Sequence, residues 1–119
     1  MYGLPPVMDL NFLTGKKLIQ VCFGANDLIL RFTDDISIAV FSSIGIGKDK
    51  GKIARHINFG EAALEILGLL DRVVARVEWT TEGTVTLTAE DETLLQIFDD
   101  SEQFESYTIT ATDGKQIIV

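Results

Sequence analysis

The chain has 119 residues, of which 46% are hydrophobic, and a formal net charge of −8. This composition argues against a disordered chain, the negative charge argues against nucleic-acid binding, and no run approaches the ~18 consecutive apolar residues of a membrane span. A single cysteine, Cys22, excludes an internal disulfide, so we expect a cytoplasmic protein. From the chain length we expect one domain over residues 1–119.

Three alternating apolar runs follow one another near the N-terminus, in residues 17–23, 28–32 and 36–42. In the first run Ile19, Val21 and Phe23 are expected to share one face, because side chains alternate along a strand. Residues of turn-forming types separate the runs. The period of two therefore predicts an antiparallel three-stranded meander.

The middle of the chain changes character. Residues 43–58 contain three glycines and lack clean periodicity, which predicts a long exposed loop. The glycine and lysine residues at 45–52 resemble a phosphate-binding loop, but their spacing does not fit that motif and no Ser or Thr follows the last lysine. Residues 60–70 predict the one helix, with a broad apolar face made of Ala63, Leu64, Ile66, Leu67 and Leu70.

A second meander follows the helix, in residues 73–79, 84–89 and 93–98. Its last two runs align with those of the first meander at an offset of 57, which matches Leu28 with Val85, Leu30 with Leu87, Ile38 with Leu95 and Val40 with Ile97. The sequence thus contains two similar halves, about 13–42 and 70–99.

A hairpin of about 104–119 follows the second half and turns at Asp113-Gly114, where we expect positive φ at both central residues. Together the elements predict an α+β, mostly β fold. It is an antiparallel barrel or sandwich of two pseudo-symmetric three-stranded meanders plus the C-terminal hairpin, with one helix between the halves.

Acidic residues are concentrated in residues 77–119, which hold ten Asp and Glu against one cation, Lys115. A surface of this sign attracts a basic protein, and aromatic side chains beside it are typical of interfaces. We therefore predict a partner-binding surface made of Glu78, Trp79, Asp99, Asp100, Glu102, Glu105 and Tyr107. The alternative is that the acids only keep the protein soluble and the aromatics belong to the core.

The residues with chemical reactivity form no catalytic pattern. His56 is the only histidine, and no nucleophile motif accompanies it. Cys22 has no cationic neighbour in sequence that would lower its pKa, and the carboxylates of residues 99–105 lack the alternation of a calcium loop. We therefore expect no enzyme activity, no cofactor and no metal.

Several short segments occur in a characteristic order along the chain: Leu13-x-Gly15, Ala62-Ala63-Leu64 with Leu67-Gly68, Phe104-Glu105-Ser106-Tyr107-Thr108-Ile109, and Asp113-Gly114. Over residues 13–119 this series resembles a group of small uncharacterised bacterial proteins with duplicated β-modules and a C-terminal aromatic-Glu-Ser/Ala-aromatic signature. The resemblance implies a bacterial intracellular protein and the fold above, and it transfers no catalytic residue. Some members look like immunity-type or other interaction proteins. The acidic turns at Asp34-Asp35 and Asp91-Glu92 depart from the Asp-Gly that is common in the group.

Three functions are compatible with these observations. The first is a non-enzymatic, immunity-like interaction module that binds a basic partner, such as a toxin domain, through its acidic C-terminal half. The second is a small-ligand binder or an enzyme with a pocket between the two halves, lined by His56, Glu105 and Tyr107. The third is a homo-oligomer in which exposed sheet edges pair.

Overall fold

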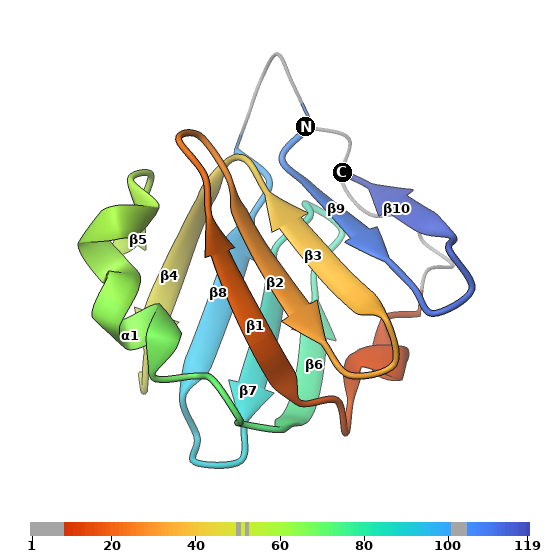
Figure 1. The fold of residues 1–119 in the computed structure, drawn as a ribbon. Coiled ribbons are helices and arrows are strands. Elements are labelled where there is room, and N and C mark those ends of the chain that lie inside the picture. The colour runs from red at the N-terminus through yellow and green to blue at the C-terminus, as the bar shows by residue number, and fades with distance from the viewer. Residues whose placement is uncertain (1–8, 50, 52, 101–104) are drawn as a thin grey trace.

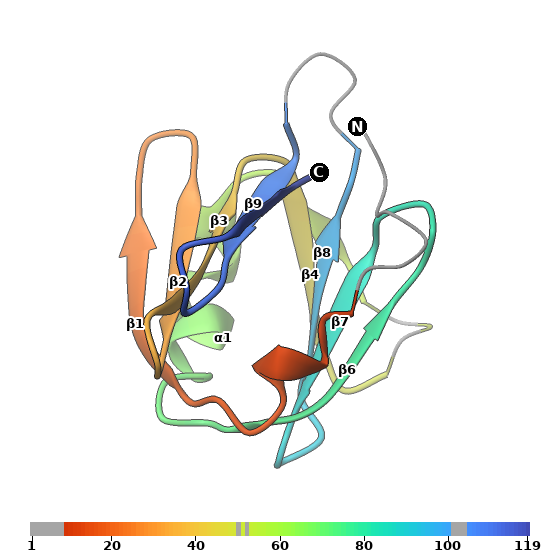
Figure 2. The same ribbon diagram turned by 90° about the vertical axis from the view of Figure 1, so that its right-hand side faces the viewer.

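The computed structural model describes residues 9–49, 51, 53–100 and 105–119. Two five-stranded antiparallel sheets pack face to face (Figures 1 and 2). In spatial order, sheet I consists of β1 (Leu18–Phe23), β2 (Leu28–Phe32), β3 (Ile36–Val40), β9 (Tyr107–Thr110) and β10 (Gln116–Ile118). Sheet II consists of β5 (Arg55–His56), β4 (Ser43–Gly47), β8 (Leu94–Phe98), β7 (Val85–Ala89) and β6 (Val74–Trp79). The prediction of a mostly β fold is confirmed, and the arrangement is a sandwich.

Each sheet combines strands from both parts of the chain. Sheet I is the first meander extended by the C-terminal hairpin β9–β10, which pairs with β3. Sheet II is the second meander extended by β4–β5, which pairs with β8. Each meander is therefore completed by a two-stranded hairpin that belongs to the other half of the chain, and the two halves are intertwined across the sandwich.

The two meanders share the same register, which confirms the predicted pseudo-symmetry. Leu28 lies opposite Val40 in sheet I, and their equivalents Val85 and Ile97 lie opposite each other in sheet II. The first strand of each meander also contains an irregularity after its first residue, between Leu18 and Gln20 in β1 and between Val74 and Arg76 in β6. The irregularity at equivalent positions is a further element of the pseudo-symmetry, and a bulge of this kind shifts the side chains that follow it to the opposite face.

The two halves meet at a bridge between Lys17 and Val73. Around this bridge the hydrogen bonds repeat at an offset of 56: Leu18 N–H donates to the Arg72 carbonyl at 3.0 Å, and Val74 N–H donates to the Lys16 carbonyl at 2.8 Å. The backbone is left-handed at the equivalent positions Gly15 (φ 84°) and Asp71 (φ 67°). Glycine suits this conformation, whereas aspartate adopts it at a cost.

The prediction of a loop over residues 43–58 is wrong in part, because the segment contains β4 (Ser43–Gly47) and β5 (Arg55–His56). Glycines are rare in strand interiors, but here they make room for a side chain packed on the sheet. A Cβ on Gly45 would lie 2.3 Å from Ile53 Cγ2, and one on Gly47 would lie 3.3 Å from Ile53 Cγ1. Ile53 therefore covers the outer face of β4, and the glycines that obscured the strand in the sequence are what allow this contact.

The predicted helix is shorter than expected, and its buried face is different. A 3-10 turn over Phe59–Ala62 precedes α1 (Ala63–Leu67), and the Asn58 side chain accepts a hydrogen bond from Gly60 N–H at its start. The buried residues are Phe59, Ala62, Ile66 and Leu69, whereas Leu64, Leu67 and Leu70 are exposed. Figure 1 shows α1 beside the edge formed by β1, β4 and β5. Among the described residues, no helix has the length and apolar character that crossing a membrane requires.

Two further expectations need correction. In β1 the bulge turns Ile19 away from the core, so that 53% of its surface is exposed and it does not share a face with Val21. The C-terminal hairpin turns at Asp113-Gly114 as predicted, but only Gly114 has a positive φ (86°). Gly114 N–H donates to the Ala111 carbonyl at 2.9 Å, as in a type I turn followed by a left-handed glycine.

Candidate partner-binding surface

The predicted acidic residues come from separate segments that the fold brings to one end of the sandwich. β6 ends at Trp79, β8 is followed by Asp99 and Asp100, and Glu105 precedes β9. The β6–β7 turn lies against the other segments, because a Cβ on Gly83 would be 2.7 Å from Asp99 Cβ. We call this surface the acidic end and define it as Glu78, Trp79, Glu82, Asp99, Asp100 and Glu105. Glu102, also predicted for this surface, lies outside the described residues.

Tyr107 does not belong to this surface, so its prediction as a partner-binding residue is wrong. Its side chain is fully buried and its hydroxyl donates a hydrogen bond to the Gly83 carbonyl. Burial raises the pKa of Tyr107 well above its ordinary value. The buried Tyr107 therefore joins β9 to the β6–β7 turn by a hydrogen bond, and this contact helps to position the acidic end.

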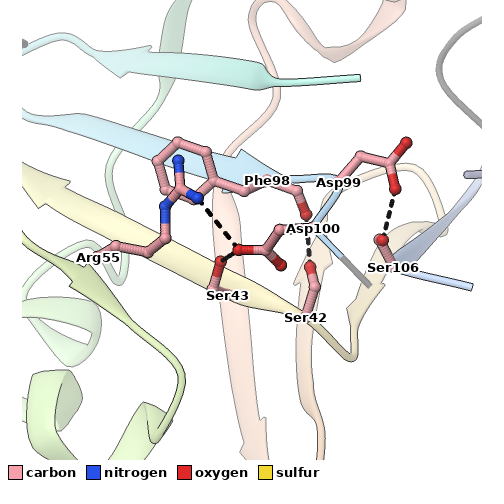
Figure 3. Close-up of polar contacts among 7 residues, drawn as sticks. All are labelled: Ser42, Ser43, Arg55, Phe98, Asp99, Asp100 and Ser106. Carbon is pink, nitrogen blue, oxygen red and sulfur yellow. Dashed lines mark hydrogen bonds and ion pairs between the residues drawn. The ribbon is translucent and has the colours of Figure 1, made fainter. Parts of the chain in front are cut away.

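Asp100 is held by a small polar cluster (Figure 3). Ser43 Oγ donates a hydrogen bond to Asp100 Oδ2, and the Arg55 guanidinium approaches the same oxygen at 3.3 Å. The Arg55 guanidinium carbon also lies 3.8 Å from the centre of the Phe98 ring, in cation–π geometry. This cluster joins β4, β5 and the end of β8, and it offsets part of the Asp100 charge.

Asp99 has a different anchor, on the opposite sheet. Ser106 Oγ donates to Asp99 Oδ1 at 2.6 Å, and Ser106 is fully buried. Nearby, Ser42 Oγ donates to the Phe98 carbonyl. The crossings between the two sheets, from β3 to β4 and from β8 to β9, are thus fixed to each other by serine hydroxyls, which gives the acidic end a rigid base.

Two further carboxylates of the acidic end, those of Glu82 and Glu105, have no cationic partner among the described residues. Within the described part of the chain, neither Glu82 nor Glu105 forms an ion pair; Glu82 is exposed and Glu105 is half-buried. Trp79 is half-buried and packs against the core.

Two acids at the opposite end of sheet II are paired with arginines. In the β7–β8 turn, Asp91 lies 3.8 Å from Arg72, and Glu92 lies 3.8 Å from Arg76. The backbone N–H and the side chain of Thr93 lower the pKa of Asp91, and the nearby Arg72 and Lys48 lower it further. Asp91 and Glu92 therefore have cationic partners nearby, whereas Glu82 and Glu105 at the acidic end have none among the described residues.

The serine and histidine side chains are not arranged for nucleophilic catalysis. His56 lies opposite Ile44, and Ser43 precedes Ile44 in β4, so the two side chains point to opposite faces of sheet II. The Ser43 and Ser106 hydroxyls both donate to carboxylates, those of Asp100 and Asp99. Among the residues that the structure describes, no group of three or more His, Cys, Asp or Glu could hold a metal ion.

The interior between the two sheets is filled by side chains. Leu30, Val40 and Ile97 are fully buried there, and Leu87 is 4% exposed. One pocket beside this interior has a volume of about 30 Å³ and is lined by residues such as Phe32, Leu87 and Leu95, and not by His56, Glu105 or Tyr107. A space of this size holds about one water molecule.

A larger groove, of about 520 Å³, lies on the outside and was not predicted. It runs between the β1–β2 turn, Phe41, and the segment that enters α1, and its walls include Phe23, Ile57 and Phe59. The sequence signal was ambiguous, because apolar residues occupy nearly every position of 62–70 and two different helix faces are compatible with them. Only the packing shows that Leu64 and Leu67 face solvent.

Comparison of the chain with protein-family models, with curated proteins and with solved structures found no match. The resemblance to small bacterial interaction proteins therefore stays a prediction.

Proposed function

We propose that this chain is a non-enzymatic binding protein whose acidic end binds a basic surface of another protein. The observation that supports this is the convergence of Glu82, Asp99 and Glu105, which are distant in sequence, on one end of the sandwich. A bacterial immunity role, in which the chain covers the basic surface of a toxin domain, is one form of this function.

The physical basis is electrostatic attraction followed by contact with an aromatic side chain. Carboxylates without local cations extend an attractive field towards a basic surface and accelerate encounter, an effect that salt weakens. Trp79 then offers apolar area next to these charges, as aromatic residues do at the centre of many interfaces. The anchors at Tyr107, Ser43 and Ser106 keep these groups in place before the partner arrives, which lowers the entropic cost of binding.

The distribution of cations supports this end over other acidic surfaces. The Glu92 carboxylate already faces an arginine, whereas Glu82 and Glu105 face none among the described residues. A basic partner would meet no competing cation at Glu82 and Glu105 among the described residues, but at the β7–β8 turn it would compete with Arg72 and Arg76.

A charge-matched pair of variants tests the proposal. The double variant Glu82→Gln/Glu105→Gln removes two charges from the acidic end, and Glu90→Gln/Glu92→Gln removes two from the opposite end of the same sheet. Binding of a synthetic ten-lysine peptide is measured by calorimetry at about 20 mM and about 150 mM salt. We expect the first double variant to weaken binding about tenfold and the second to change it by less than about twofold.

Equal weakening by the two double variants would contradict the proposal, because it would show that only net charge matters. An affinity that does not fall with salt would contradict the electrostatic basis. Circular dichroism of both variants shows whether the fold is kept, and the exposed ion pair lost with Glu92 contributes little to stability.

A further inference from the structure

The exposed large apolar side chains gather on one side of the molecule. Eight are exposed among the described residues, and seven of them lie along β1, the groove and α1: Ile19, Phe23, Phe41, Ile57, Leu64, Leu67 and Leu70. Phe23, Phe41 and Ile57 line the groove, and Leu70 lies next to β1 because Asp71 N–H donates to the Leu18 carbonyl at 2.9 Å. We call these seven residues the apolar strip.

The size of the strip is that of an interface. Leu64 exposes 85% of its surface and Ile57 exposes 79%, although both are fully apolar. The seven side chains together expose on the order of 700 Å², which exceeds the largest apolar patch of a typical monomer and approaches the ~800 Å² that each partner buries in a stable complex.

Comparison of the two halves of the chain indicates what covers the strip. β1 and β6 are the equivalent outer strands of the two sheets. Their starts pair with each other at the Lys17–Val73 bridge, and beyond it each strand has an edge that faces away from its own sheet. In β6 this edge is protected by Arg76 and Glu78, which are exposed charged residues. Their equivalents in β1 are Gln20 and Cys22, so the strand Leu18–Phe23 contains no charge at all. Charged residues on an edge strand prevent pairing with another copy, and of the two equivalent strands β6 has this protection and β1 lacks it.

From these observations we infer that the apolar strip is the interface between two copies of this chain, related by a twofold axis, with their β1 strands antiparallel. Such an edge-to-edge contact is self-complementary, because the same patch serves both copies. β1, which forms part of the strip, carries no charge, so two copies of an acidic protein can approach each other along it.

The charges at the two ends of the strip fit this arrangement. Lys17, at the start of β1, is exposed, and Glu61, beside the groove at the other end of the strand, is exposed as well; neither forms an ion pair within the described residues. Antiparallel pairing places the start of one β1 beside the end of the other. Lys17 of each copy therefore comes near Glu61 of its partner, at the groove, where Asp27 also lies. The ends therefore attract, and a parallel arrangement would set like charges against each other.

Mass measurement over a concentration series, by sedimentation or light scattering, tests this inference. We expect the wild-type chain to have twice the mass of one copy at about 100 µM and to dissociate on dilution. Ile19→Lys in β1 and Leu64→Lys in α1 should each raise the dissociation constant at least about tenfold. Ile118→Lys is the matched control: Ile118 is 48% exposed, close to the 53% of Ile19, and it lies on β10, the opposite edge of the same sheet. It should leave the dissociation constant within about twofold of wild type.

A wild-type chain that keeps the mass of one copy up to about 1 mM would overturn the inference and assign the strip to a different protein. An equal effect of Ile118→Lys would overturn it too. Because Leu64 is almost fully exposed, its variant folds whether or not β1 tolerates a lysine, so the test does not depend on Ile19 alone. Lys17→Glu should weaken the dimer and Lys17→Glu/Glu61→Lys should restore it; an unchanged dissociation constant for Lys17→Glu would contradict the antiparallel arrangement.

Discussion

The buried hydroxyl of Tyr107 supports a sharp prediction, because Tyr107→Phe removes a single atom from the anchor of the acidic end. The ring stays in its packed site, but the Gly83 carbonyl, which is also buried, loses its donor. Leaving a buried acceptor unpaired costs about 1–3 kcal/mol. For 119 residues the entropy of unfolding is about 0.25 kcal/mol per kelvin, so the melting temperature should fall by about 4–12 °C.

The matched control is Thr112→Val, which also removes a hydroxyl that donates to a backbone carbonyl. Thr112 Oγ1 donates to the Asp34 carbonyl at 2.6 Å, but it is exposed, so water replaces it and the melting temperature should change by less than about 3 °C. Thermal unfolding followed by circular dichroism measures both variants. If Tyr107→Phe melted within 1 °C of wild type, the buried hydrogen bond would not hold the turn and the reasoning would fail.

The same residue predicts a dependence on alkaline pH. Burial raises the pKa of Tyr107 above its ordinary value of 10.0, so above that pH the unfolded chain releases a proton that the folded chain retains. This contribution to stability is present below pH 10 and is lost as the pH rises, by up to about 1.4 kcal/mol per pH unit. Denaturant unfolding between pH 9 and 11.5 should show this loss in wild type, and Tyr107→Phe should lack it.

Three further substitutions test other contacts, each by denaturant unfolding. Asp71→Gly should stabilise the chain by about 0.5–1 kcal/mol, because Asp71 has the left-handed backbone that Gly15 has in the other half; destabilisation would show that the Asp71 side chain contributes more than the strain costs. Thr88→Val should stabilise it by about 1 kcal/mol, because Thr88 Oγ1 is buried without a partner among the described residues, and a loss of stability would reveal an unrecognised hydrogen bond. Gly45→Ala should destabilise it by about 1–3 kcal/mol, since the new methyl group would meet Ile53. That cost should shrink in an Ile53→Ala background, and an unchanged cost would place the clash elsewhere.

The strands with clear alternation were predictable, because alternation reports directly which face is buried. The offset between Leu28 and Val85, and between Val40 and Ile97, was visible in the sequence and reappears in the register of the two sheets. The pairing of each meander with a hairpin from the other half of the chain was not predictable, because strand pairing between distant segments depends on the packing of the whole sandwich and leaves no local signal. β4 was missed for a related reason. Its glycines predict a loop, and only the structure shows that Ile53 packs on them.

The candidate surface was predictable as a composition but not as an arrangement. The sequence shows that acids concentrate after residue 77, yet Asp91 and Glu92 lie at the far end of sheet II and are paired with arginines. The burial of Tyr107 could have been predicted, since it alternates with Ile109 in β9 and both are fully buried. The exposure of Leu64 could not, because a helix that is apolar on most sides does not show in sequence which side meets the core.

Amide chemical shifts recorded while the ten-lysine peptide is added test the location of the binding surface most directly, because they report on each residue at once. The account predicts that the changes in chemical shift concentrate at Glu78, Glu82, Asp99 and Glu105 and disappear at high salt, while the shifts of Glu90 and Glu92 do not change. Shifts spread evenly over all acidic residues, or centred on the β7–β8 turn, would contradict it.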